Sequence, residues 1–345
     1  MKKFSFLLFC IALMLGLFLS SCLKTSGPTP QPVLRIGLVG GSGGFNDAGF
    51  NQSILTGFIH AANDFPMYCQ ARESKTASDI PVNIDYYLLN SFEMIMTAGY
   101  ESSQAILEAA QAHPGTDFVI LDYSATSPPA NLLCATFDVD QSSFPCGFLA
   151  AWWAYNQNNM NPVTGFVGGP EIPEIRQFSV SFTNGVSYFN NLYHKNVSIV
   201  GCYASSFSDT LQGARLADSL LKLNASVIFT FAGKTGNGAL YKVKEAGKWA
   251  IGVDVDQYYS IPQVGSILLT SCIKELGLMT YTILGNYYNN KFPGGTVIRG
   301  DLSNQGVGMA PFHYYGLLIP DSVKTAITAI ETGIKNGTIK TGWPE

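Results

Sequence analysis

Charged residues are scarce in this chain of 345 residues, since Asp, Glu, Lys and Arg together make up only 13% of it. The formal net charge is −4 at pH 7, and no basic run occurs beyond Lys2 and Lys3. This composition argues against nucleic acid as a partner. Histidines number four and lack the spacing of metal ligands. The sequence therefore predicts no metal site and no cofactor.

Cysteines are also few, and their spacing is irregular. Seven occur in all, and Cys10 and Cys22 belong to the N-terminal segment described next. The odd number that remains does not describe a disulfide framework. We expect most of these cysteines to be buried small hydrophobic residues, and a single Cys134–Cys146 disulfide is the alternative left open.

One long apolar run is present, and it lies at the N-terminus. Residues 4–18 follow Lys2 and Lys3 and precede Leu19-Ser20-Ser21-Cys22, a pattern typical of a signal segment. The last four residues resemble the bacterial lipobox, in which the cysteine receives a lipid. We predict a lipoprotein signal peptide over 1–21 and a proline-rich, lipid-anchored tether over 22–32. An ordinary secretory signal with a chance cysteine is the alternative.

After this segment, no apolar run is long enough to span a bilayer. We therefore expect a protein of the bacterial cell envelope that is held to a membrane by a lipid on Cys22. The inner or outer leaflet is not indicated by the sequence. About 324 residues remain after the signal peptide, which is too many for one core and suits two lobes.

Short β-branched apolar runs alternate with longer helical patterns along the rest of the chain, which is typical of parallel sheets with crossover helices. The pattern comes in two successive series, so we predict two α/β sheets. The strands predicted for the first series are Val33–Val39, Val82–Leu89, Phe118–Asp122 and Leu132–Phe137, and its helices are Phe50–Asn63 and Glu93–Ala112. The strands predicted for the second series are Thr164–Val167, Val197–Tyr203, Val227–Phe231, Trp249–Val253 and Ser266–Leu269.

Three strings resemble pieces of enzyme motifs, but none is complete. Gly233-Lys234-Thr235 matches the end of a phosphate-binding P-loop, yet Ile228 stands where the motif needs glycine. Ser271 to Lys274 and Lys234 to Gly236 match two β-lactamase motifs in the wrong chain order, and the third motif is absent. We therefore expect no enzymatic activity.

The residues that follow the predicted strands are polar and aromatic. Ligands of open α/β sheets bind where the carboxyl ends of the strands meet. Carboxylates and amides at these positions can hydrogen-bond hydroxyls and ring nitrogens, and phenylalanines can stack on a flat ring. Such residues follow strands of both series, for example Asn46-Asp47-Ala48-Gly49-Phe50-Asn51, Asp122-Tyr123-Ser124, Ser206-Phe207-Ser208-Asp209 and Asp254-Val255-Asp256-Gln257.

Several of these stretches, in the same order, resemble the basic membrane protein family of lipoproteins, which includes PnrA-like purine nucleoside receptors of ABC importers. The stretches are residues 46–52, Phe166-Val167-Gly168-Gly169, Phe207-Ser208-Asp209, residues 232–238, residues 251–257 and Leu269-Thr270-Ser271 with Lys274. The resemblance covers the mature chain and implies a type I periplasmic-binding fold, with two Rossmann-like lobes joined by three hinge strands. It implies an N-terminal lobe of residues 33–137 and 271–295 and a C-terminal lobe of residues 138–270 and 296–345. The hinges are expected near Phe137–Val139, Leu268–Thr270 and Ile298–Gly300.

The resemblance also implies a ligand site. Its residues are Asp47, Phe50, Asn51, Asp122, Phe207, Gly233, Asp254 and Lys274. Phe50 and Phe207 would stack on a base, with Phe231 as the alternative to Phe207. Asn51 and Asp122 would contact the base edge, and Asp254 and Lys274 the ribose. Family members often carry Asp where this chain has Gly41, so the sequence does not fix which base or sugar binds.

The function expected from these features is that of a substrate-binding lipoprotein that captures a purine nucleoside and delivers it to the permease of an ABC transporter. A different nucleoside-like or sugar ligand is one alternative. A surface antigen or adhesin that binds host protein on the same fold is the other.

Overall fold

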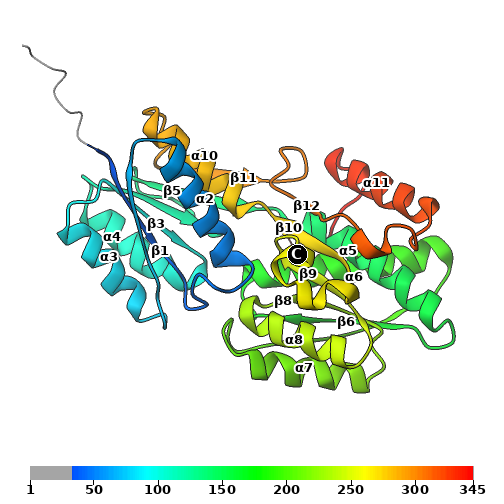
Figure 1. The fold of residues 1–345 in the computed structure, drawn as a ribbon. Helices are drawn as coiled ribbons and strands as arrows, with labels where there is room; N and C mark the ends of the chain where they lie inside the picture. The colour runs from blue at the N-terminus through cyan, green and yellow to red at the C-terminus, as the bar shows by residue number, and fades with distance from the viewer. Residues whose placement is uncertain (1–32, 345) are drawn as a thin grey trace, which may run out of the picture. The chain divides into compact units, whose positions relative to one another are not determined.

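The structure, a computed structural model, describes residues 33–344. The predicted signal peptide over 1–21 and the whole tether over 22–32, including Cys22, lie outside the described residues. Two six-stranded sheets organise the chain (Figure 1). The first has the order β11-β5-β4-β3-β1-β2 and the second β12-β10-β9-β8-β6-β7. Every pair of neighbouring strands is parallel except β10 with β12.

The first sheet is built mainly from the N-terminal part of the chain. Its strands are β1 (Arg35–Val39), β2 (Tyr68–Arg72), β3 (Met94–Ala98), β4 (Asp117–Leu121), β5 (Leu132–Phe137) and β11 (Val297–Gly300). Its helices are α2 (Phe50–Asp64), α3 (Asp79–Leu89), α4 (Ser103–Ala112) and α10 (Leu276–Tyr288). Alternate residues of a strand point to opposite faces, so Met94 and Met96 share a core with Phe58 of α2. Ile95 packs instead with Ile84 of α3.

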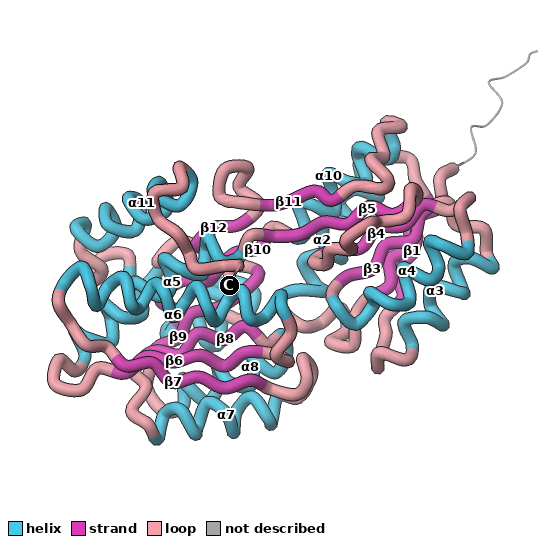
Figure 2. The backbone as a smooth tube through the Cα atoms, turned by 180° about the vertical axis from the view of Figure 1, so that it is seen from behind, coloured by secondary structure: helices cyan, strands magenta, loops and turns pink. Residues whose placement is uncertain are grey.

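The second sheet comes from the middle of the chain. Its strands are β6 (Val163–Gly168), β7 (Ser198–Tyr203), β8 (Val227–Phe231), β9 (Trp249–Asp254), β10 (Leu268–Lys274) and β12 (Val307–Met309). Its helices are α5 (Val139–Gln157), α6 (Pro173–Tyr193), α7 (Thr210–Lys222), α8 (Gly233–Glu245), the short α9 (Gln257–Ser260) and α11 (Asp321–Lys335). Helices α5 and α6 cover one face of the sheet, and α7 and α8 cover the other (Figures 1 and 2).

Two predictions in the first series are wrong. Residues 82–89 belong to helix α3, whose buried residues Ile80, Ile84 and Tyr87 recur at helical spacing. Tyr87 packs its ring against Gly37 and donates a hydrogen bond to the Gln70 carbonyl at 2.7 Å. The predicted helix over 93–112 contains strand β3 before α4, because a short, fully buried apolar run has no periodicity that separates a strand from a helix.

The chain passes between the two sheets three times, after Phe137, after Lys274 and after Gly300. The first and third crossings lie where hinges were predicted. The middle prediction is wrong, because residues 268–270 pair with β9 inside the second sheet. Sheet membership would also shift the predicted lobe boundaries, since all of β10 is in the second sheet and β11 is in the first.

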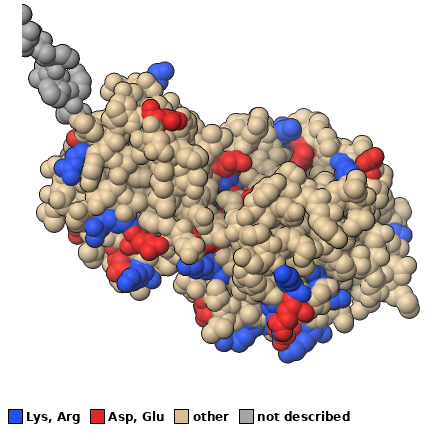
Figure 3. All heavy atoms as spheres, in the orientation of Figure 1, with Lys and Arg blue, Asp and Glu red and all other residues tan. Residues whose placement is uncertain are grey.

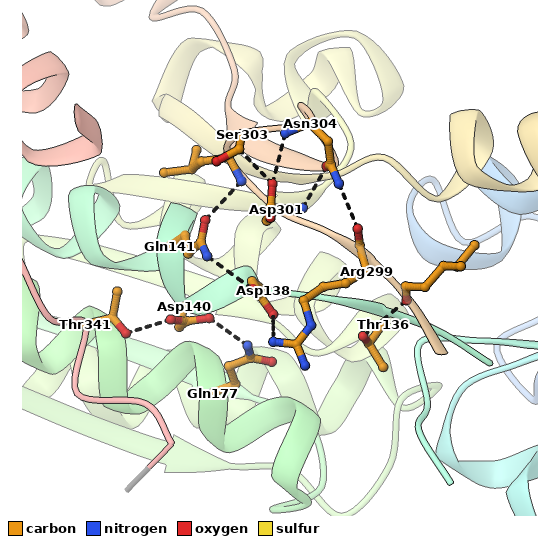
Figure 4. Close-up of polar contacts among 12 residues, drawn as sticks. Thr136, Asp138, Asp140, Gln141, Gln177, Arg299, Asp301, Ser303, Asn304 and Thr341 are labelled. Atoms are coloured by element: carbon orange, nitrogen blue, oxygen red, sulfur yellow. Dashed lines mark hydrogen bonds and ion pairs between the residues drawn. The ribbon is translucent and has the colours of Figure 1, made fainter. Parts of the chain in front are cut away.

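The first and third crossings are tied together by polar contacts (Figure 4). The Asp138 amide donates to the Gly300 carbonyl at 2.8 Å, and the Arg299 guanidinium lies 3.2 Å from the Asp138 carboxylate. Gln141 links the two segments as well, because its amide donates to Asp138 and accepts from the Leu302 amide. These contacts hold two of the three connections side by side.

The cysteines of the described residues all carry free thiols, so the alternative of a Cys134–Cys146 disulfide is not realised. Cys134, Cys146 and Cys272 are buried, as expected for small hydrophobic residues, while Cys69 and Cys202 are half-buried. No helix among residues 33–344 is both long and apolar enough to cross a membrane.

Candidate functional site

One cavity collects the loops that follow strands of both sheets. All eight ligand-site residues predicted from the sequence line it, namely Asp47, Phe50, Asn51, Asp122, Phe207, Gly233, Asp254 and Lys274. They come from opposite sheets because the carboxyl ends of the strands of both sheets converge there.

Asp47 organises the loop that follows β1. Its carboxylate is buried and accepts four hydrogen bonds, from the amides of Gly49, Asn51 and Gln52 and from the Asn51 side chain, at 2.8 to 3.1 Å. These donors sit at the start of α2, so Asp47 caps this helix. The Asn51 oxygen in turn accepts from the Gly41 amide at 2.9 Å. With its acceptor sites occupied, Asp47 is suited to positioning Phe50 and Asn51.

Lys274 forms the centre of a charged group that joins the two sheets. Its Nζ lies 2.8 Å from Oδ2 of Asp122, which follows β4, and 4.0 Å from Oδ1 of Asp254, which ends β9. Both aspartates have left-handed backbone conformations, with φ of 59° and 66°, which Asp tolerates better than most residues. From the sequence, Lys274 and Asp254 were predicted together as contacts of the ribose. In the structure, the shorter contact of Lys274 is with Asp122.

Burial strongly affects the titration of this group. The pKa of Asp254 is raised to about 7, chiefly by desolvation, with Lys274 opposing the change and Asp122 and Asp47 adding to it. Burial alone would lower the pKa of Lys274, but the carboxylates of Asp122 and Asp254 outweigh it and raise the pKa. Lys274 therefore stays charged, and Asp254 changes its protonation near neutral pH.

Aromatic rings form the walls of the cavity. Phe50 is half-buried, and its ring centroid is 5.5 Å from Lys274 Nζ. Phe207 is also half-buried and packs closely against Gly169, where a methyl group would sit 2.3 Å from a ring carbon. Phe231 is only 2% exposed and stacks on Phe178 at 5.2 Å and 16°. Phe207 and Phe231 were the two candidates for the second stacking ring, and the Phe207 ring is the more accessible of them.

Two acidic residues of the cavity were not predicted. Glu101 follows β3 and accepts hydrogen bonds from the amide and hydroxyl of Ser42 at 3.1 and 2.8 Å. Its carboxylate also approaches Gly41, where a side-chain carbon would lie 3.6 Å from Oε2. Glu174 is in the first turn of α6 and lines the same cavity. Glu101 lies inside the helix predicted over Glu93–Ala112, and no motif in the sequence marks Glu174.

Contacts outside the cavity also join the two sheets. Asn237 of α8 donates from Nδ2 to the Asp47 carbonyl at 2.7 Å, and the Ser260 hydroxyl donates to the Ala48 carbonyl at 2.7 Å. We call Asn237 and Ser260 the clasp. Neither residue lines the cavity, so the clasp holds the loop after β1 against the second sheet without occupying the ligand space.

The chemistry of the site is that of recognition. No group of three or more His, Cys, Asp or Glu side chains that could hold a metal ion occurs in the described part of the chain. On the face drawn in Figure 3, basic and acidic side chains are scattered over a mostly uncharged surface, with no basic stripe. Stacking walls combined with buried carboxylates suit a flat ring that carries hydroxyl or amino groups.

Comparison with known proteins agrees with this geometry. A family model described as ABC transporter substrate-binding protein PnrA-like matches residues 36–335. The chain is 27% identical over 328 residues to the ABC transporter nucleoside-binding protein BmpA of Lactococcus lactis subsp. cremoris, covering 89% of this chain and 88% of the relative. It is 28% identical over 306 residues to basic membrane protein B of Borreliella burgdorferi, covering 85% and 86%.

The fold is similar to that of a solved ABC transporter solute-binding protein from Aeropyrum pernix K1. The TM-score is 0.83 at 20% identity, with 89% of this chain and 92% of the other covered. At this identity the likeness concerns the fold. Two parallel-rich sheets joined by three crossings confirm the predicted type I periplasmic-binding fold.

Proposed function

Because this chain belongs to the PnrA-like family of ABC transporter substrate-binding proteins, we propose that it binds a nucleoside in the cavity between its two sheets and delivers it to the permease of an importer. The observation that carries the proposal is the joint presence of two accessible aromatic rings and a charged group supplied by both sheets, Phe50 and Phe207 with Asp122, Asp254 and Lys274. A nucleoside has a flat base to stack and hydroxyls to donate. The nucleoside-binding relative supports the same ligand class.

The charge of the cavity favours a neutral ligand. Five carboxylates line it, those of Asp47, Glu101, Asp122, Glu174 and Asp254, against the two amino groups of Lys234 and Lys274. A phosphate would be repelled by the excess of negative charge in a site of low effective dielectric. We therefore expect nucleosides to bind and nucleotides to be excluded.

Binding is coupled to lobe closure in this proposal. The ligand contacts groups on both sheets, so it stabilises the arrangement in which they face each other. The three crossings after Phe137, Lys274 and Gly300 are where the chain would bend. The polar contacts around Asp138 and Arg299 would keep two of these crossings moving together.

Membrane attachment is a separate part of the proposal. A lipid on Cys22, which lies outside the described residues, would hold the protein at the outer face of a membrane near its permease. Mass spectrometry of the protein from a bacterial membrane fraction tests this idea. The expected result is an N-terminal peptide that starts at Cys22 and carries acyl chains, and an unmodified peptide spanning Ser21 and Cys22 would contradict it.

Calorimetry of the fragment from Thr25 onward tests ligand binding. The ligand set is adenosine, guanosine, inosine, cytidine and uridine, their free bases, ribose and the matching 5′-monophosphates. The proposal expects micromolar or tighter binding of at least one nucleoside, and binding weaker by at least 100-fold for its monophosphate. Chromatography of the recovered ligand should show it intact. Binding of sugars alone, or conversion of the nucleoside to another product, would reject the proposal.

A further inference from the structure

Among the described residues, Glu174 is the cavity carboxylate that has a fully buried oxygen without a hydrogen bond. Oε2 of Glu174 is buried and has no hydrogen-bond partner among residues 33–344. By contrast, Asp122 accepts from Lys274, and Glu101 accepts from Ser42. A buried carboxylate oxygen without a donor is costly. A ligand that brings a donor to this position would therefore gain affinity.

The position of Glu174 on α6 directs it to the ligand space. Glu174, Ile175 and Phe178 all line the cavity, and their spacing puts them on one face of the helix. The Phe178 ring, one turn further along, is 5.1 Å from Lys274 Nζ. Glu174 thus shares its side of the cavity with the apolar side chains of Ile175 and Phe178, which suit the plane of a base better than a sugar.

The charge of the Glu174 carboxylate determines which ligand groups it can bind. Burial raises the pKa of Glu174 and Asp122 on the opposite sheet adds to the rise, while the residue's own backbone amide and Lys274 partly oppose it. Lys274 is already shared between Asp122 and Asp254. An ionised carboxylate accepts hydrogen bonds and donates none. In its ionised form, Glu174 would therefore bind an amino group of a ligand and repel a carbonyl oxygen.

We propose that Glu174 is a specificity residue that selects nucleosides whose base carries an amino group, by accepting a hydrogen bond from that group. This inference rests on the proposed nucleoside ligand and adds a chemical subclass to it. A nucleoside without the amino group would leave the buried Glu174 oxygen unpaired. Binding sites discriminate strongly against ligands that leave a buried polar group without its hydrogen bond.

Two matched ligand pairs test the proposal by calorimetry at pH 7.5. Guanosine and inosine differ only by the 2-amino group, and adenosine and purine riboside differ only by the 6-amino group. The expected result for the wild-type protein is a preference of at least about tenfold for the amino ligand in one or both pairs. In Glu174→Gln the preference should fall below about threefold, mainly through weaker binding of the amino ligand.

Glu171→Gln is the matched control, since Glu171 is an exposed carboxylate three residues away that does not line the cavity. It should bind all four ligands as the wild type does. Thermal unfolding checks that each variant is folded. If Glu174→Gln does not fold, Glu174→Asp, which withdraws the carboxylate by one methylene, should reduce the preference at least threefold.

Three results would overturn the proposal. The first is a wild-type protein that binds both members of each pair equally, and the second is a preference that persists unchanged in Glu174→Gln. The third is an equal loss for all four ligands together with a reduced preference for ribose over 2′-deoxyribose, which would assign Glu174 to the sugar. A wild-type protein that binds no nucleoside at all would instead reject the proposed function.

Discussion

Protonation of Asp254 should control how tightly the cavity binds its ligand. Burial raises the pKa of this carboxyl from 3.8 to about 7. At about 1.36 kcal/mol per pKa unit, keeping Asp254 ionised in the closed cavity costs at most about 4 kcal/mol. Between pH 3.8 and about pH 7, Asp254 is protonated in the folded protein but ionised in the unfolded chain. The destabilisation is therefore absent below pH 3.8, grows as the pH rises and is complete above about pH 7.

A nucleoside that donates its hydroxyls to Asp254 favours the ionised form, so binding lowers the pKa of this group and releases a proton. Affinity is therefore full above pH 7 and falls as the pH falls through 7. With a pKa of about 7 in the free protein and a much lower one in the complex, binding is weaker by about tenfold at pH 6 and about 90-fold at pH 5, relative to pH 8.

Calorimetry at pH 5, 6, 7 and 8, repeated in buffers of different ionisation enthalpy, measures both the affinity and the proton release. Asp254→Asn is the control, since it keeps the shape but cannot titrate. It should bind more than tenfold more weakly than the wild type at pH 8 and show little change between pH 8 and pH 5. A wild-type affinity that is constant across this range would refute the assignment of Asp254 to the ligand.

Four further variants separate binding from folding. Phe50→Ala should weaken nucleoside binding by about 1–3 kcal/mol through lost stacking, with little change in unfolding temperature. Phe231→Ala should instead lower the free energy of unfolding by about 3–5 kcal/mol, because Phe231 is buried against other rings. Calorimetry measures the first effect and denaturant unfolding the second. Replacing both clasp residues, Asn237 and Ser260, with alanine should weaken nucleoside binding by about 1–3 kcal/mol, because the closed, ligand-bound arrangement loses two hydrogen bonds. An unchanged affinity in calorimetry would assign the clasp no part in closure. Asp47→Ala should lower the free energy of unfolding by about 0.5–2 kcal/mol through loss of the α2 cap, and a stability equal to that of the wild type would contradict the capping role.

Much of the fold could be predicted from the sequence, because the alternation of apolar runs and helical patterns is a local signal. The second series shows this best, since all five of its predicted strands overlap observed ones. The first series failed where local signals are ambiguous. The apolar residues of α3 look like a strand, and β3 is a short buried run that was absorbed into a helix. Edge strand β2 was missed because it is half exposed and alternates weakly.

The residues around the cavity could also be predicted, but their partners could not. All eight predicted residues line one cavity. That Lys274 lies closer to Asp122 than to Asp254 depends on how two sheets face each other. Such a contact joins residues 152 positions apart. The capping role of Asp47 is decided by the turn that follows it, and the unpaired oxygen of Glu174 is decided by its neighbours in space. None of these leaves a local pattern.

The balance between open and closed lobes follows from two opposing sets of contacts. The clasp favours closure without a ligand, with two hydrogen bonds that each contribute about 1 kcal/mol. Asp122, Asp254 and Glu174 oppose it, because closure brings three carboxylates around one lysine and removes them from water. The desolvation of one buried charge exceeds the contribution of both clasp bonds. In the proposed function, the closed arrangement therefore needs a ligand whose donors satisfy those carboxylates. The same acidic groups that would select the ligand would then favour the open form of the free protein.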